Sequence, residues 1–311
     1  MSQMRLIPFK IESVTETLTE IPYGVKQIEA PKLWKNGEKG EGIVIAVLDT
    51  GIDRNHPDLV ENIIDGRNFT DEGSEDDYSD RNGHGTHVAG TIAAFENGKG
   101  VVGVAPEAKL LICKVLDRNG SGSYQSIIEG IRYATNWVGS KGERVRVLNM
   151  SLGGEKDDEL EAAILEACAK GIVVAVASGN EGDDDEKTLE YGYPAGYNEC
   201  ITVAACDENK KLAYFSNNSL QVDCIAAGVN VNSTYLNGQY AKLSGTSMAT
   251  PHIAGALALI IGLGEKQFRR TLTESEIYAL LVKCSTSLGY ESSSEGHGLL
   301  RLSLMYKKRR N

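Results

Sequence analysis

The sequence predicts an α/β fold in which a mainly parallel central sheet carries helices on both faces. The chain has 311 residues, enough for one large domain with a substantial core. Short apolar runs alternate with segments of helical periodicity, which is the pattern of successive βαβ units. The apolar runs are continuous, as in residues 43–48, and this is typical of strands buried on both faces of a parallel sheet.

Each element follows from its local pattern. Apolar runs predict strands at residues 43–48, 109–116, 145–150, 172–177, 201–205 and 222–226. Helical spacing predicts helices at residues 84–95, 123–137, 159–169 and 275–284, and a long one that starts around Met248. We expect Pro251 in the first turn of that helix, where its missing N–H costs little.

Composition and charge narrow the functional classes. A net charge of -11 argues against general nucleic-acid binding. The longest apolar segment, residues 253–263, is shorter than a membrane's width, so we expect a buried helix and no membrane partner. Residues 1–10 lack the sustained apolar stretch of a signal peptide, which predicts a cytoplasmic protein whose six cysteines stay reduced. The acid-rich stretches 71–80 and 182–186 are expected to be solvated surface loops.

Three Gly-rich segments supply an acid, an imidazole and a hydroxyl. They are Val-Leu-Asp-Thr-Gly-Ile-Asp at 47–53, Asn-Gly-His-Gly-Thr-His-Val-Ala-Gly at 82–90 and Gly-Thr-Ser-Met-Ala-Thr-Pro-His at 245–252. A serine hydroxyl is a poor nucleophile unless a base takes its proton and a third group orients that base. Asp49, His84 and Ser247 are therefore the candidate triad.

Plainer interpretations exist for the same residue types. Asp53 suits a turn, and His56, His87 and His252 suit structural hydrogen-bonded positions. His84 and His87 are three residues apart but lack the acid of the His-Glu-x-x-His zinc motif. A serine before a helix is often only an N-cap, and an asparagine after a strand, such as Asn180, is often only a turn residue.

The three motifs resemble those of the subtilisin-like serine proteases, the subtilases. Their order, Asp then His then Ser, differs from the orders of chymotrypsin-like enzymes and α/β-hydrolases. The resemblance implies a subtilisin-like catalytic domain over residues 21–300. It also implies that Asp49 orients His84, that His84 is the general base for the nucleophile Ser247, and that Asn180 donates to the oxyanion.

The resemblance extends to the substrate groove. Two segments correspond to the strand edges that hold an extended peptide in this family: Gly120, Ser121, Gly122 and Ser151, Leu152, Gly153, Gly154. The primary specificity pocket is expected between Ser151–Gly154, Ala177–Gly179 and Gly192. Small residues there imply a roomy apolar pocket that prefers large apolar side chains, and Glu181 at its rim would admit a basic one.

The resemblance also implies calcium, whose preferred ligands are oxygens. The first set would be Asp58, the Asn97 side chain and the carbonyls of Phe95, Lys99 and Val101. The second would be the carbonyls around Ala195, Tyr197 and Cys200 with Asp223. The family usually adds a side-chain amide from the mature N-terminus, where this chain has Thr19. Ordinary surface loops are the alternative at both places.

Within the family, the chain is most similar to the intracellular subtilisins of Bacillus-like bacteria, which are usually dimers. In that group a Leu-Ile-Pro-Tyr/Phe extension blocks the active site, and Leu6, Ile7, Pro8 and Phe9 match it. We therefore expect an inhibitory extension at 1–20, whose apolar residues lie as a strand along both groove edges, and a solvated basic tail at 301–311.

The leading hypothesis is an endopeptidase acting on proteins and peptides. A catalytically silent peptide-binding protein on the same fold is the alternative, disfavoured because all four catalytic positions are intact. An esterase or amidase is weaker still, because the peptide-binding edges are present.

Overall fold

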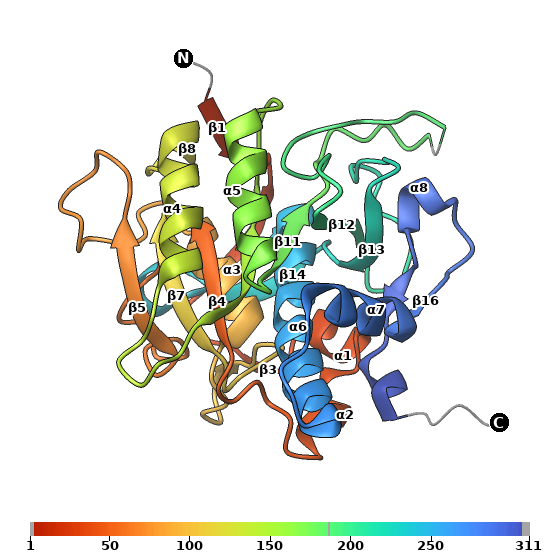
Figure 1. Ribbon diagram of the computed structural model, residues 1–311, viewed down its shortest axis with the longest axis horizontal. Helices are drawn as coiled ribbons and strands as arrows, with labels where there is room; N and C mark the ends of the chain where they lie inside the picture. Colours follow the sequence, from red (N-terminus) through yellow and green to blue (C-terminus); the bar gives the residue numbers. More distant parts are fainter. Residues whose placement is uncertain (1–2, 186, 307–311) are drawn as a thin grey trace.

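A computed structural model describes residues 3–185 and 187–306, and a nine-stranded sheet runs through its centre (Figure 1). From one edge to the other, its strands are β5 (Ile63–Asn68), β7 (Lys109–Lys114), β4 (Val44–Asp49), β9 (Val145–Met150), β11 (Val173–Ala177), β12 (Cys200–Cys206), β13 (Val222–Ala227), β17 (Leu299–Leu300) and β16 (Ser285–Thr286). Neighbours from β5 to β17 are parallel, and β16 is antiparallel to β17. The predicted fold class is confirmed.

The strand order reverses beside β4. The chain passes from β4 to the β5 edge, returns through β7, and then crosses to the other side of β4 to form β9. Every residue of β4 is buried, in line with its continuous apolar sequence. In open α/β sheets the crevice at the carboxyl ends of strands beside such a reversal is where ligands bind.

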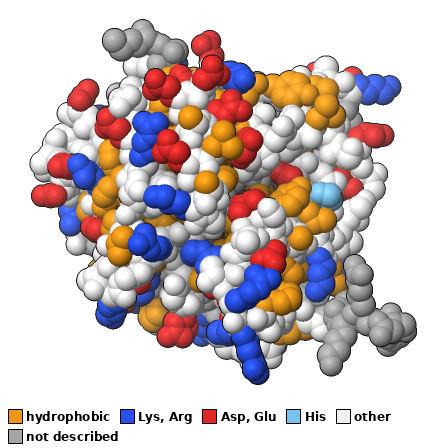
Figure 2. Space-filling view, in the orientation of Figure 1, with side chains coloured by type: hydrophobic (Ala, Val, Ile, Leu, Met, Phe, Trp, Pro, Cys, Tyr) orange, Lys and Arg blue, Asp and Glu red, His pale blue; other side chains and the backbone are white. Residues whose placement is uncertain are grey.

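Helices cover both faces of the sheet. They are α1 (Tyr23–Gln27), α2 (Ala30–Trp34), α3 (His84–Ala93), α4 (Tyr124–Asn136), α5 (Asp158–Ala169), α6 (Thr246–Phe268), α7 (Glu274–Cys284), α8 (Ser292–Glu295) and the 3-10 turns η1 (Leu236–Gly238) and η2 (Leu302–Tyr306). Helices α4 and α5 pack side by side on one face (Figure 1), and α3 and α6 pack together on the other. On the face seen in Figure 2, Lys and Arg side chains are interspersed with Asp and Glu.

The N-terminal residues form strands that join small sheets. β1 (Gln3–Leu6) lies between β8 (Ser121–Ser123) and β10 (Leu152–Gly153), β2 (Lys10–Thr15) pairs with β15 (Tyr240–Ser244), which pairs with β14 (Val231–Thr234), and β3 (Thr19–Glu20) pairs with β6 (Gly100–Val101). Residues 3–20 are therefore bound to the domain surface at three places.

The structure differs from the sequence predictions in two elements, β5 and the start of α6, and agrees with the expected buried helix at 253–263. Strand β5 was not predicted, because an edge strand with Asp65 and Arg67 lacks an apolar run. Helix α6 begins at Thr246, so Pro251 is inside it and not in its first turn. The helix is also long and apolar enough to cross a membrane by composition, but 94% of its apolar window is buried, so it is a core helix.

The C-terminal residues divide into two parts. Leu302 and Met305 are buried against the core, so the packed domain continues through η2 to residue 306. The basic run Lys307-Lys308-Arg309-Arg310 lies outside the described residues. All six cysteines are free.

Candidate active site

Asp49 and His84 meet at the carboxyl end of the central sheet. Asp49 is the last residue of β4, and His84 is the first residue of α3. His84 Nδ1 lies 2.9 Å from Asp49 Oδ1 and 3.0 Å from Oδ2, and both side chains are buried. The Thr50 N–H also donates to Asp49 Oδ1, at 2.7 Å. The carboxylate is thus satisfied in an apolar setting where an unpaired one would be costly, and it holds the imidazole through Nδ1, which leaves Nε2 free of this hydrogen bond.

Glycine is required where α3 approaches the end of β4. A Cβ at Gly85 would lie 2.2 Å from the carbonyl oxygen of Gly51. Any larger residue would push the helix, and His84 with it, away from Asp49.

Asp80 ties the two elements together. Its Oδ1 accepts hydrogen bonds from Thr50 Oγ1, Asn82 N–H and Gly83 N–H, each at 2.9 Å. Its Oδ2 accepts from Thr86 N–H at 3.0 Å and Thr86 Oγ1 at 2.6 Å. The buried carboxylate thereby caps the N-terminus of α3 and holds it to the residue after Asp49.

The sequence analysis placed Asp80 in a solvated loop, and that interpretation was wrong. The available signal was its position four residues before His84, within reach of the amides at a helix N-terminus.

Ser247 is the second residue of α6 and is held by Ser151, which follows β9. Pro251 has no N–H for the Ser247 carbonyl four residues earlier. That carbonyl instead accepts a hydrogen bond from Ser151 Oγ at 3.3 Å, and Ser247 Oγ donates to the Ser151 carbonyl at 3.4 Å. Among the described residues His84 Nε2 has no hydrogen-bond partner, and the Phe9 ring lies 4.8 Å from the His84 ring.

The other buried histidines are structural. Burial lowers the pKa of His87 to about 3 and that of His252 to about 4. His87 Nε2 contacts the Val231 and Ala241 carbonyls, and His252 Nδ1 contacts the Met248 carbonyl. His56 likewise contacts the Gln239 carbonyl, and Asp53 accepts backbone N–H bonds from Asn55 and Gly238. None of these groups reaches Ser247 by a hydrogen bond.

Asn180 points its amide into the groove. Its Oδ1 accepts hydrogen bonds from Thr246 N–H at 2.9 Å and Thr246 Oγ1 at 2.8 Å. These bonds aim Nδ2 at the opposite side, where it donates to the carbonyl oxygen of Pro8 at 2.5 Å. The arrangement is that of an oxyanion donor next to the residue that precedes Ser247.

Strand β1 occupies the groove between the two predicted edges. Arg5 pairs with Ser121 on one side and Gly153 on the other, and Leu6 N–H donates to the Gly120 carbonyl at 2.8 Å. A Cβ at Gly120 would lie 2.6 Å from Leu6 Cδ1, so glycine permits this close approach. Met4 is fully buried in the cluster that contains Leu116, Tyr124 and Leu152. Of these three residues, the sequence analysis named only Leu152.

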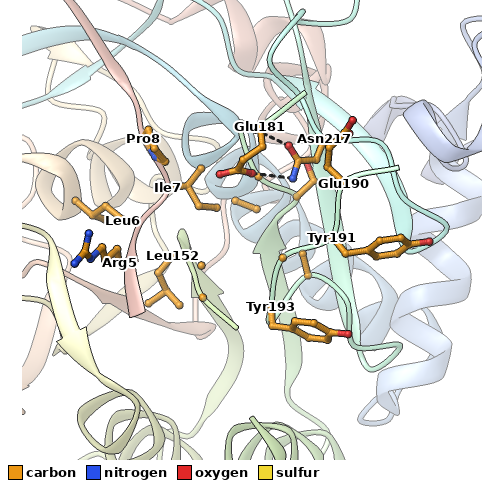
Figure 3. A pocket seen from close by; sticks show the side chains of 17 residues that line it. Arg5, Leu6, Ile7, Pro8, Leu152, Glu181, Glu190, Tyr191, Tyr193 and Asn217 are labelled. Atoms are coloured by element: carbon orange, nitrogen blue, oxygen red, sulfur yellow. Dashed lines mark hydrogen bonds between the residues drawn. The ribbon is translucent and has the colours of Figure 1, made fainter. Parts of the chain in front are cut away.

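The predicted specificity-pocket residues, with the exception of Ser151, line one cavity of about 330 Å³. Its walls include Leu152–Gly154, Ala177–Gly179, Gly192 and Ala195, and Ile7 faces into it (Figure 3). Glu181 also lines it, but its Oε2 accepts hydrogen bonds from Asn180 N–H and Asn217 Nδ2. Glu190 and Tyr191 complete the outer wall and were not predicted.

The residues predicted to bind calcium do not form an oxygen cage as arranged. Asp58 accepts hydrogen bonds from Asn97 Nδ2 at 2.8 Å and Val101 N–H at 3.0 Å, while Asn97 Oδ1 accepts from Lys99 N–H. A calcium ion there would require the Asn97 amide to turn its oxygen toward Asp58. The Phe95 N–H donates to the Asp58 carbonyl.

The second set fits less well. Both Asp223 oxygens accept hydrogen bonds, from Thr202 N–H and Tyr278 OH, and burial raises the pKa of this carboxyl. The Ala195 carbonyl accepts from Thr202 Oγ1, and the Tyr197 carbonyl from Cys200 N–H. Within the described residues, no group of three or more His, Cys, Asp and Glu side chains is placed to hold a metal.

The structure pairs a buried carboxylate with an imidazole at the end of a parallel sheet, and an extended chain lies in the groove beside them. Residues 40–299 match the Subtilase family of peptidases. The chain belongs to this family and is a serine endopeptidase.

Several curated proteins are similar over nearly the whole chain. An intracellular serine protease of Paenibacillus polymyxa is 51% identical over 303 residues, which cover 96% of this chain and 91% of that protein. The major intracellular serine protease of Bacillus subtilis (strain 168) is 49% identical over 304 residues, with 96% and 93% covered. Subtilisin DY of Bacillus licheniformis is 42% identical over 283 residues, with 91% and 97% covered.

Replacing Asp80 by asparagine tests whether this residue positions the triad. Asn offers one acceptor oxygen in place of two, so part of the link between Thr50, Thr86 and α3 is lost. We expect kcat to fall about 100-fold with KM nearly unchanged, because small displacements of reacting groups cost about that much. Asp77→Asn, which removes the charge that pairs with Arg81 and keeps an acceptor oxygen for the Ser79 N–H, is the matched control. A lower melting temperature with unchanged kcat would make Asp80 merely structural.

Chelation tests calcium at Asp58 and Asn97. An ion bound only by the native state stabilises it by mass action. We expect EDTA to lower the melting temperature of the Ser247→Ala protein and added Ca²⁺ to restore it, and Asn97→Ala to abolish the response. Equal melting temperatures with EDTA and with Ca²⁺ would show that no calcium ion stabilises the folded protein.

Proposed function

We propose that this protein is an intracellular serine endopeptidase that cleaves polypeptides through Ser247, His84 and Asp49. The observation that carries the proposal is the buried Asp49–His84 pair at the end of β4, together with Asn180, whose side-chain amide donates to a carbonyl of the chain in the groove. Its cellular location is inferred from two relatives, 51% and 49% identical, that are both named intracellular serine proteases.

Each residue has one task in the reaction. Ser247 Oγ attacks the peptide carbonyl carbon while His84 Nε2 takes the hydroxyl proton, and Asp49 stabilises the imidazolium that forms. Asn180 Nδ2 and the Ser247 backbone N–H donate to the oxyanion. The tetrahedral intermediate collapses, His84 protonates the leaving amine, and the acyl-enzyme is then hydrolysed by water with His84 as base.

The pocket supports a preference for large apolar residues before the cleaved bond. Its walls are mostly small or apolar, and Ile7 already faces into it. The Glu181 carboxylate is engaged by two hydrogen bonds, which disperses the charge that a basic side chain would need.

Residues 1–20 are proposed to hold the enzyme inactive. Ile7 occupies the position of the residue before the cleaved bond, yet Asn180 donates to the carbonyl of the next residue, Pro8. The bond after Ile7 is thus one residue out of register with the oxyanion donor. Pro8 has no N–H and a restrained ring, which supports this displaced path. The tether keeps the local concentration of the extension high, on the order of millimolar.

The silent binding protein remains the second candidate, because the Ser247 hydroxyl donates to Ser151 and not to His84. We attribute that hydrogen bond to the occupied groove, in which Phe9 lies over His84. A homodimer and calcium binding also remain proposals from the resemblance.

The endopeptidase assignment is tested by Ser247→Ala. Removing the nucleophile should lower casein hydrolysis by about a millionfold while the circular dichroism spectrum stays unchanged. Ser275→Ala is the matched control, because it removes a serine hydroxyl at an exposed position of α7, away from the groove. Near-normal proteolysis by Ser247→Ala, with products mapped by mass spectrometry, would exclude the triad.

The inhibitory role is tested at Pro8. We expect the full chain to hydrolyse a peptide slowly at first, and a protein starting near Thr19 to do so from the first seconds. Pro8→Ala should restore a cleavable bond after Ile7 and speed removal of the extension, seen by mass spectrometry. Val14→Ala, at an exposed residue of β2, is the control. Equal initial rates for the long and short proteins, without clipping, would rule out inhibition. If the Pro8→Ala protein stays inactive and its extension stays uncut, the extension does inhibit the enzyme but Pro8 is not the cause.

A further inference from the structure

Lys114 is a fully buried lysine that the proposed mechanism does not use. It is the last residue of β7 and lies opposite Asp49 in the parallel pairing of β7 with β4. Its side chain is 0% exposed. A buried ammonium is costly unless acceptor oxygens and an opposite charge surround it, so its partners indicate what this lysine does.

The ammonium joins two turns that follow adjacent strands. Lys114 Nζ donates to the Thr50 carbonyl at 2.8 Å and to the Leu116 carbonyl at 3.1 Å. Thr50 is also bonded through its N–H to Asp49 Oδ1 and through its Oγ1 to the Gly85 N–H. The Leu116 N–H donates to the Asp49 carbonyl at 3.2 Å. Lys114 therefore completes the set of bonds that fixes the turn after Asp49.

Glu72 balances the buried charge from the surface side. Its Oε2 lies 3.4 Å from Lys114 Nζ and accepts the Arg118 N–H at 3.0 Å, while its Oε1 accepts Arg118 Nε at 2.5 Å. The Arg118 carbonyl in turn accepts Asn82 Nδ2 at 3.0 Å, two residues before His84. The lysine and its counter-ion thus connect both elements that carry the acid and the imidazole.

The ammonium also acts on the active site through its charge. Only the backbone of Thr50 separates it from the Asp49 carboxylate, because the Thr50 carbonyl accepts from Lys114 and the Thr50 N–H donates to Asp49. A cation at this range in a buried site disfavours the imidazolium form of His84. Its effect is opposite in sign to that of Asp49.

The other charged groups around these residues are few. Hydrogen bonds from Ser79 lower the pKa of Asp77, and the charge of Lys114 adds to this. The Asp80 carboxylate is engaged by Thr50 and by the start of α3. The buried histidines of α3 and α6 stay neutral near pH 7, because burial lowers their pKa to about 3 and about 4. None of these groups is altered in the variants below.

We propose that Lys114 is a positioning residue of the active site. It fixes the turn after Asp49 through the Thr50 carbonyl, and with Glu72 as its counter-ion it sets the charge that His84 meets on taking a proton. This rests on the proposed function, in which His84 is the general base. A neutral side chain of similar length would leave two carbonyls without a donor and change that charge.

Two substitutions and one control separate these effects. Lys114→Met removes the ammonium and keeps an unbranched side chain, whereas Glu72→Gln removes only the counter-charge. Lys109→Met is the matched control, because Lys109, at the opposite end of β7, also donates to two oxygens, the Glu61 carbonyl and Asn62 Oδ1. Each full chain is assayed with a peptide substrate across pH once its rate is constant. Active sites are counted with a phosphonate that releases a fluorescent group.

We expect Lys114→Met to lower kcat about tenfold or more while KM changes less than about threefold, because small displacements of reacting groups mainly cost rate. The pH midpoint of kcat should rise by about 0.5 in Lys114→Met, since the imidazolium is no longer opposed by a cation. It should fall by a few tenths in Glu72→Gln, where the cation is no longer balanced. Lys109→Met should change neither quantity.

The opposite signs distinguish positioning from a purely structural role, which would lower the melting temperature alone. Unchanged kcat in Lys114→Met, or pH midpoints that move in the same direction in both variants, would overturn the proposal. If Lys114→Met does not fold, Glu72→Gln decides: a lower midpoint supports the proposal and an unchanged one overturns it. An active Ser247→Ala protein would instead overturn the proposed function.

Discussion

The buried Asp49 carboxylate is the constraint on which the rest of this structure depends. A charge at the end of an apolar strand must be surrounded by donors, and here His84 and the Thr50 N–H provide them. The imidazole can reach it only because Gly85 lets α3 approach β4, and because Asp80 fixes the start of that helix to Thr50. The hydrogen bonds that satisfy the two buried carboxylates, Asp49 and Asp80, therefore also fix the position of His84 at the start of α3.

On the other side of the groove, one residue again has two structural roles. Pro251 leaves one carbonyl of α6 without its helical partner, and Ser151 fills that place. Ser151 also begins the segment that leads into β10, the edge strand of the groove. The nucleophile and the peptide-binding edge are in this way positioned by a single pair of serines, so a substrate held on β10 lies in register with Ser247.

The sequence predicted the parts of this protein that depend on continuous patterns. Buried strands such as β4 and β12 are apolar throughout, and the triad lies in motifs with fixed Gly spacing. It did not predict β5, whose edge position removes the apolar signal. It also did not predict the role of Asp80, because the position of this residue before His84 indicates a helix cap but not the hydrogen bond from Thr50, thirty residues away. For the two predicted calcium sites, the resemblance suggested the ligands, but the orientation of the side chains decides whether their oxygens converge. Asn97 points its side-chain nitrogen, and not its oxygen, toward Asp58.

The extension is part of the chain that it covers, which has a kinetic consequence. A tethered segment occupies its groove to the same degree at any dilution, because closing is a first-order event. Its removal by another copy of the protein would be second order. Dilute populations would therefore stay silent for long periods, whereas in concentrated ones each molecule that opened would convert others, and activity would rise with a lag that shortens as the protein accumulates.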